Sequence, residues 1–222
     1  MRRARPLLTV ALGAALIAAL AFAILASKGG SGTTTSPVVS VPGEEAVRPA
    51  SGGFDGAALP GSHPAPPFKL TDQYGLTMSL SSLRGEPVVL TFLYARCGAP
   101  CVLVAQQIRG ALDELGGHPA RVLIVSADPA GDTAPAVRAF LAEVSLSGRV
   151  HYLTGTEARL APIWKAYGVH PAAVGAAAFA KYATVRLLDS RGRERVLYGP
   201  EQLTPEALAH DIRRLLGSQP GR

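Results

Sequence analysis

The sequence predicts an α/β domain with a mixed central sheet flanked by helices, carried behind an N-terminal transmembrane anchor helix. Three observations support this prediction. An uncharged apolar run occupies residues 6–27, strand-like and helix-like segments alternate over residues 87–167, and hairpin patterns at residues 68–80 and 182–198 flank that alternation. Alternating strands and helices favour parallel pairing, whereas the strands of a hairpin pair antiparallel.

The apolar run at residues 6–27 is long enough to cross the roughly 30 Å hydrocarbon core of a bilayer as a helix. The basic tip, residues 1–5, predicts a cytoplasmic N-terminus and a single-pass protein of the cell membrane whose domain lies on the extracytoplasmic side. A cleaved signal peptide is the alternative, since Ala21-Phe22-Ala23 fits a small-residue cleavage pattern, but the run exceeds a usual signal core. Under both readings the domain leaves the cytoplasm.

The net charge of +6 is concentrated at this N-terminus, where Arg2, Arg3, Arg5 and Lys28 supply four positive charges. The remaining +2 is too small to indicate nucleic-acid binding. We expect the rest of the chain to comprise three parts. They are a flexible Gly-, Ser-, Thr- and Pro-rich linker at 28–60, a domain at 61–218 and a tail at 219–222.

The domain is expected to open with a β-hairpin, whose strands 68–70 and 77–80 flank the turn 72–75, followed by one helical turn ending at Gly85. Residues 87–94 are almost continuously apolar and β-prone, which predicts a central strand covered on both faces. Apolar residues then recur at helical spacing from Cys101 to Leu115, before a glycine C-cap at 116–117.

The second half repeats this pattern. The expected elements are a strand at 121–127, a helix at 134–144, a strand at 150–153, a helix at 157–167 and a hairpin formed by 182–189 and 194–198. Residues 172–180 are rich in Ala and Gly and give no assignment. Thr204, Pro205 and Glu206 then indicate the start of a final helix that ends at Gly217.

Cys97 and Cys101, the only cysteines, follow the apolar strand and precede a helix. The positive end of the helix dipole favours the thiolate form of Cys97, and Arg96 is a candidate for adding to this effect. Such a pair supports a redox disulfide, attack on another disulfide, or binding of Cu(I). A tetrahedral zinc site is less favoured, because the sequence has no second cysteine pair or His-x₃₋₅-His arrangement to complete it. A disulfide that closes so short a loop would stabilise the fold only weakly.

Several further motifs surround the cysteines. They are Phe68-Lys69-Leu70-Thr71-Asp72-Gln73-Tyr74-Gly75, Leu83-Arg84-Gly85, Ser126-Ala127-Asp128-Pro129 with Asp132-Thr133, Leu153-Thr154-Gly155 and Trp164-Lys165-Ala166-Tyr167-Gly168-Val169. Together with Cys-x-x-x-Cys, they make the chain resemble the Sco/SenC family from about residue 66 to residue 217. The resemblance implies a thioredoxin-like fold, a copper ion bound by Cys97 and Cys101, and a role in assembling the copper centre of cytochrome oxidase. The implied partner is cytochrome oxidase subunit II or another extracytoplasmic cysteine or copper protein.

One departure from the family concerns the third copper ligand. The family places a histidine about eight residues before an Asp or Gly of the last hairpin, but counting back from Asp189 reaches Lys181. A lysine binds a metal only after losing a proton, and its ordinary pKa is about 10.4, so Lys181 is a poor ligand but can stabilise a thiolate by its charge. His170 is the candidate replacement ligand.

The remaining candidates receive structural interpretations. Asp128 is expected to cap a turn or the following helix, although its place at a strand end also makes it a candidate for tuning the site. Trp164 and Tyr167 are expected in the core. We assign no ligand role to the histidines at positions 63, 118, 151 and 210.

Three functions remain open at this point. The first is copper handling by Cys97 and Cys101. The second is thiol-disulfide exchange without stable copper binding, in which Cys97 attacks and Cys101 resolves. The third is a binding scaffold with an inert disulfide.

Overall fold

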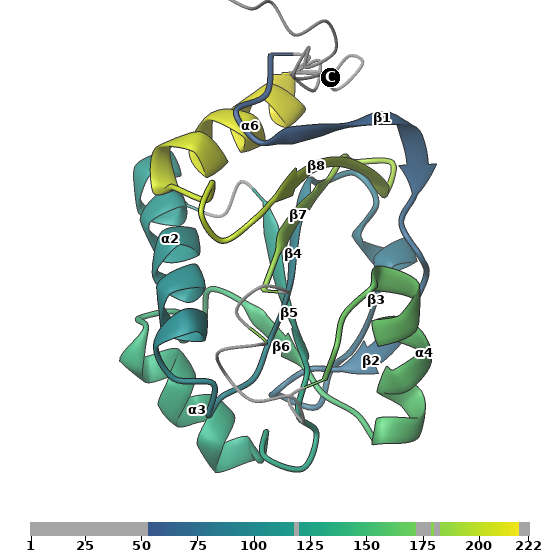
Figure 1. Cartoon of the computed structure of the whole chain (residues 1–222), viewed down its shortest axis with the longest axis vertical. Helices are drawn as coiled ribbons and strands as arrows, with labels where there is room; N and C mark the ends of the chain where they lie inside the picture. The colour runs from purple at the N-terminus through teal and green to yellow at the C-terminus, as the bar shows by residue number, and fades with distance from the viewer. Residues whose placement is uncertain (1–52, 118–119, 172–178, 180–182, 218–222) are drawn as a thin grey trace, which may run out of the picture. The chain divides into compact units, whose positions relative to one another are not determined.

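The computed structural model describes residues 53–117, 120–171, 179 and 183–217 (Figure 1). The predicted anchor and most of the predicted linker lie outside these residues, and so does Lys181. Within the described part of the chain, no helix is long and apolar enough to span a bilayer.

The described residues form a six-stranded mixed sheet, as the sequence predicts. Its strands follow the spatial order β1 (Ala57–Pro64), β8 (Arg193–Tyr198), β7 (Val185–Leu188), β4 (Val88–Leu93), β5 (Arg121–Ser126), β6 (His151–Leu153). β4, β5 and β6 pair in parallel, whereas β7 is antiparallel to β4 and to β8, and β1 is antiparallel to β8. The parallel half comes from the predicted strand–helix alternation, and the antiparallel half contains the predicted hairpin.

β4 is the centre of the sheet, and all six of its residues are buried. The helices α2 (Ala99–Leu115), α3 (Ala134–Glu143) and α6 (Pro205–Gly217) lie on one side of the sheet, and α4 (Glu157–Tyr167) lies on the other (Figure 1). This cover on both faces explains why β4 has no polar alternation. Thr91, its one polar residue, donates its hydroxyl to Thr184 O at 2.9 Å.

The predicted first hairpin is present as β2 (Lys69–Thr71) and β3 (Thr77–Ser79), followed by the 3₁₀ helix η1 (Leu80–Leu83). Its turn is held by Asp72, whose carboxylate accepts the N–H groups of Tyr74 and Leu76 at 2.9 and 2.8 Å. The other carboxylate oxygen contacts His151 Nδ1 at 2.9 Å. The hairpin is therefore fastened to the start of β6.

The domain begins earlier than the sequence predicts, with a strand that was not predicted. We expected a linker to residue 60, but β1 already pairs Ala57 with Leu197 of β8. Its prolines and small residues favour a linker on sequence grounds, but they are tolerated here because β1 is an edge strand. Phe54 is buried as well, and the guanidinium groups of Arg195 and Arg214 lie 5.8 and 5.3 Å from its ring centre. The domain thus includes residues from at least Phe54 onward.

Candidate functional site

The cysteine loop leaves the C-terminal end of β4 and turns directly into α2. Cys97 N donates to Tyr94 O at 3.1 Å, which tightens the chain after the strand. Gly98 is the N-cap of α2 with φ = 75°, a conformation that strongly favours glycine, and its carbonyl accepts Val102 N at 3.2 Å. Pro100 then lies in the first turn of α2, where its missing N–H costs no hydrogen bond.

Cys97 and Cys101 form a disulfide, with Cα atoms 5.7 Å apart. Cys101 lies in the first turn of α2 and is fully buried, as its place on the apolar helical stripe predicts. Cys97 is only 2% exposed, so it is hardly more accessible than Cys101. The two sulfurs are thus adjacent and sheltered at the end of the central strand.

The surroundings of the disulfide favour thiolates once it is reduced. Both sulfurs lie at the N-terminal end of α2, where unpaired N–H groups and the helix dipole stabilise negative charge. Arg96, the residue before Cys97, is exposed, so its charge is screened by water. A role for Arg96 in tuning the pair stays a prediction.

Asp128 fulfils its predicted turn-capping role. Its carboxylate accepts Gly131 N at 3.0 Å, and its carbonyl accepts Asp132 N at 2.9 Å. This turn connects the C-terminal end of β5 to α3, next to the strand that carries the cysteine loop. Asp128 also helps to raise the pKa of Tyr94, although burial of the phenol is the larger cause.

Asp132 is the acidic group that binds the cysteine loop to the neighbouring strands. Its Oδ1 accepts the N–H of Ala95 at 2.7 Å, and its Oδ2 accepts the hydroxyls of Ser126 and Tyr152 at 2.6 and 2.8 Å. The side chain is nearly buried, and burial raises its pKa in spite of these three hydrogen bonds. The sequence offers Asp132 only as part of a family motif, because its partners come from three separate segments: the loop after β4, the end of β5, and β6.

Phe179 is the one described residue of the segment 172–182, and it is fully buried. Its ring meets that of Tyr94 edge-on, with centroids 5.0 Å apart. Because Tyr94 lies three residues before Cys97, this contact holds Phe179 at the cysteine end of the sheet. Lys181 follows Phe179 by two residues but lies outside the described residues.

His170 is exposed and lies just after α4. Nothing in the structure tests it as a copper ligand, and it stays a prediction. Trp164 and Tyr167 are core residues, as predicted. The Trp164 indole donates to Ser126 O at 2.9 Å, and the Tyr167 hydroxyl donates to Pro66 O at 2.8 Å.

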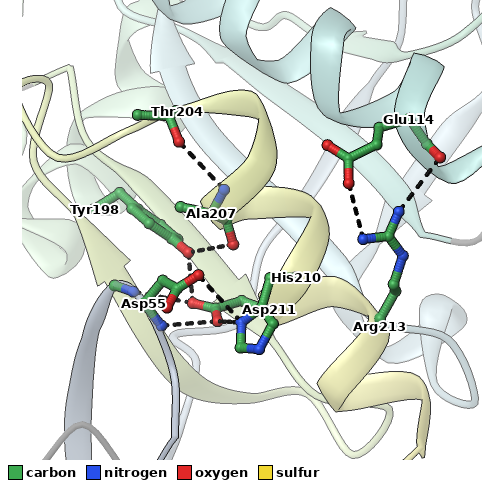
Figure 2. A network of polar contacts seen from close by, with 9 residues as sticks. Asp55, Glu114, Tyr198, Thr204, Ala207, His210, Asp211 and Arg213 are labelled. Carbon is green, nitrogen blue, oxygen red and sulfur yellow. Dashed lines mark hydrogen bonds and ion pairs between the residues drawn. The ribbon is translucent and has the colours of Figure 1, made fainter.

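A second polar cluster lies on α6, and Figure 2 shows it. Asp211 is fully buried, and its two oxygens accept the N–H groups of Asp55 and Gly56, the Tyr198 hydroxyl and His210 Nδ1. Asp55, His210 and Asp211 offer ligand atoms within 4.8 Å of one another, the one such group of three found among the described residues. Since four donors already occupy Asp211, we interpret the cluster as a clamp that holds β1 against α6.

The mixed sheet, the covering helices and the cysteine pair between a central strand and a helix define a thioredoxin-like protein. The family model for SCO1/SenC matches residues 57–217, which is most of the chain. The chain therefore belongs to the SCO1/SenC family. The match starts at the first residue of β1, Ala57, and so includes this strand in the domain, which was predicted to begin at residue 61.

Solved structures support the same fold. Apo Sco1 from Thermus thermophilus is 22% identical with a TM-score of 0.59, and the match covers 73% of this chain and 96% of that one. ScoI from Bradyrhizobium japonicum with copper bound is 26% identical with a TM-score of 0.53, covering 68% and 98%.

BsSco is a member of the Sco family of cytochrome c oxidase assembly proteins, and a disulfide switch was identified in it. It is 18% identical to this chain with a TM-score of 0.55, and the match covers 71% of this chain and 96% of that one. No curated protein matches the chain by sequence.

Proposed function

We propose that this chain is a membrane-anchored, extracytoplasmic protein that handles copper through Cys97 and Cys101 during assembly of the cytochrome oxidase copper centre. The observation that carries the proposal is the placement of two adjacent, sheltered sulfurs at the end of β4 and the start of α2. Copper is the cargo of this function. Its recipient is cytochrome oxidase subunit II or another extracytoplasmic cysteine or copper protein.

The donor set suits Cu(I). Thiolates are soft ligands that select Cu(I) over harder cations, and reduction of the Cys97–Cys101 bond leaves two of them close together. The Bradyrhizobium japonicum ScoI structure holds copper, which shows that a related chain carries the ion. For this chain, two-coordinate thiolate binding is the minimal arrangement.

The third donor is the point at which this chain departs from its family. The family's histidine is replaced in the sequence by Lys181. In this proposal the ammonium group of Lys181 favours the thiolate form of the pair by its charge and does not bind copper. In this proposal the third position is filled by His170 or by a thiol of the partner protein.

Titration of the reduced protein with Cu(I) against a chromophoric competitor tests the proposal. We expect one Cu(I) per chain, lost in the Cys97→Ser, Cys101→Ser double variant. Lys181→His restores the family's ligand and is expected to tighten binding. If His170 is the third donor, His170→Ala weakens binding while the matched change His63→Ala does not. Failure of the reduced protein to bind Cu(I) tightly overturns the copper assignment.

Thiol-disulfide exchange is the second candidate function, and the disulfide between Cys97 and Cys101 favours it. The Cys97 thiolate would attack a partner disulfide and release one partner thiol. Cys101 would then displace the second, so that the partner is reduced and this pair is oxidised to the bond described above. A disulfide switch has been identified in BsSco, a related protein.

The reduction potential of the pair separates the two functions. A potential close to that of the compartment supports exchange, whereas one far below it makes reversible exchange impossible. A third outcome remains distinct. If the Cys97→Ser, Cys101→Ser variant still supports oxidase assembly in cells, the domain acts as a binding scaffold and both chemical functions are wrong.

The proposed location is tested separately from the chemistry. Fusion of a reporter enzyme that is active only outside the cytoplasm to the C-terminus should give full activity, and carbonate extraction should leave the protein in the membrane fraction. Release of a shortened, soluble chain would instead support the cleaved signal peptide.

A further inference from the structure

One end of the sheet is rich in arginine, and it is the end opposite the cysteines. Cys97 lies beyond the C-terminal end of β4, whereas Arg84 lies before its N-terminal end. The turn between β7 and β8 lies beside Arg84, because Gly85 N donates to Ser190 O at 2.8 Å and Arg84 Nη1 donates to Arg191 O at 2.8 Å. The strand register places Arg121, the first residue of β5, next to Val88 at the same end.

We call this surface the basic edge. It comprises five arginines on adjoining segments: Arg84, Arg121, Arg191, Arg193 and Arg195. Its carboxylates are Glu86, which pairs with Arg121 at 2.7 Å, Asp189, which lies 3.3 Å from Arg195, and Glu194, which pairs with Arg186 of β7 at 2.9 Å. Counting Arg186 with its partner, six arginines and three carboxylates leave a net charge of +3.

Two of these arginines are exposed and lack an acidic partner. Within the described residues, neither Arg84 nor Arg191 forms an ion pair with a carboxylate, and both are solvent-exposed. Asp189 accepts the backbone N–H groups of Arg191 and Arg193 at 2.9 and 3.0 Å through Oδ1, and its Oδ2 contacts the Arg195 guanidinium, so neither oxygen pairs with the Arg191 guanidinium. The two guanidinium groups are therefore available to an external anion.

We propose that the basic edge docks the domain onto the anionic lipid headgroups of the membrane that the N-terminal anchor enters. This proposal rests on the proposed anchor. Guanidinium groups bind phosphate through paired, charge-assisted hydrogen bonds, and an exposed cluster of arginines matches a surface dense in phosphates. A basic segment near an anionic bilayer gains about fivefold in binding for each arginine.

The chain between anchor and domain is long enough for this arrangement. β1 runs toward the basic edge, since its last residue, Pro64, pairs with Arg193. Its eight residues span about 26 Å. Between the predicted anchor and the described domain lie 25 residues, 28–52, and a chain of this length and composition would have a root-mean-square span of about 28 Å. The basic edge can therefore touch the bilayer while β1 starts at the far end of the domain.

Docking through the basic edge would fix the orientation of the cysteine pair relative to the membrane. With the basic edge on the bilayer, β4 runs away from the membrane, and Cys97 and Cys101 face the aqueous compartment. Docking would thereby present the pair to the extramembrane part of a membrane-bound partner, and would keep it from facing the lipid.

Hydrogen exchange on the full-length protein in lipid nanodiscs tests the orientation. The readout is the exchange rate of two segments, 81–87 and 189–195, in discs of phosphatidylcholine with and without phosphatidylglycerol. We expect severalfold slower exchange in anionic discs at low salt, reversed at 1 M salt, where the Debye length falls to about 3 Å. The double variant Arg84→Gln, Arg191→Gln should lose this protection.

A matched control keeps the test specific. Arg138 on α3 and Arg159 on α4 are exposed arginines away from the basic edge. Changing both to glutamine removes the same charge and should leave the protection intact. Equal loss in both double variants, or equal protection in neutral discs, overturns the basic edge as the docking surface.

The experiment distinguishes an error in the proposed anchor from an error in the proposed docking surface. If the protein does not insert into neutral discs, the anchor is wrong. Salt-sensitive protection of the two segments by anionic vesicles then still decides whether the edge binds lipid. If the protein inserts but the segments exchange alike in all discs, docking is wrong and the anchor stands. Protection that appears only after an acidic protein is added assigns the edge to a protein partner and also overturns the proposal.

Discussion

Replacing Asp132 with alanine is expected to loosen the base of the cysteine loop. The change removes the acceptor of three donors, the Ala95 amide and the hydroxyls of Ser126 and Tyr152. The Tyr152 hydroxyl has a second acceptor, Leu93 O at 3.3 Å, whereas the Ala95 amide and the Ser126 hydroxyl donate to no other acceptor within the described residues. At about 1–3 kcal/mol for each orphaned donor, less the relief from removing a buried charge, the free energy of unfolding should fall by about 2–4 kcal/mol.

Urea unfolding of the oxidised protein measures this loss. The signal is the fluorescence of Trp164, the only tryptophan, which is buried beside β5. Asp113→Ala is the matched control, because Asp113 forms only exposed ion pairs, and such pairs contribute about 0–1 kcal/mol. A loss for Asp132→Ala no larger than that of the control would refute the assigned role.

The stability contributed by Asp132 is expected to decrease as pH rises. Burial raises the pKa of Asp132 above its ordinary value of 3.8, so the folded protein holds this proton more tightly than the unfolded chain does. The contribution of Asp132 to stability is therefore full below pH 3.8 and falls as pH rises through the folded pKa. Asp132→Asn should remove this decline, which unfolding curves at several pH values would show.

Three further predictions follow from other parts of the domain. Burial would raise the pKa of Asp72, but its hydrogen bonds lower this pKa below 3.8, so the free energy of unfolding should fall as pH drops through the lowered pKa. Asp72→Asn should reduce this fall, as measured by urea unfolding at several acidic pH values. Reduction of Cys97–Cys101 should lower the free energy of unfolding by about 2 kcal/mol, measured by urea unfolding with and without reductant, because the bond closes only a short loop. Gly56→Ala should lower it by about 1–3 kcal/mol in the same assay, because a Cβ would lie 2.5 Å from Val196 Cγ1 in the core.

The fold was largely predictable where local pattern and burial agree. β4 is continuously apolar and is buried on both faces. The glycine C-cap after Leu115 and the Thr204–Pro205 start of α6 are local signals, and both occur where the sequence predicts them. β1 was missed because its prolines and small residues carry no strand signal. It becomes a strand only because β8 offers it an edge and Asp211 holds the chain before it.

The site was predictable only in part. The position of Cys97 and Cys101 between a strand and a helix follows from hydrophobic periodicity alone, and it predicted their proximity. Asp132 was not identified, since its partners lie in different strands and meet only after the sheet has formed. The basic edge is hidden for the same reason, because Arg84 and Arg191 are 107 residues apart in sequence.

The sequence by itself thus determined the α/β class, the central strand and the chemistry-bearing cysteine pair, because each depends on neighbouring residues. It also carried the family resemblance that the match over residues 57–217 confirms. Tertiary structure alone decided the edge strand, the depth at which Cys97 is buried, the carboxylate that holds its loop, and the arginines gathered at the far end of the sheet. These features depend on which strands pair, a choice made by the burial of the whole domain and not by any local segment.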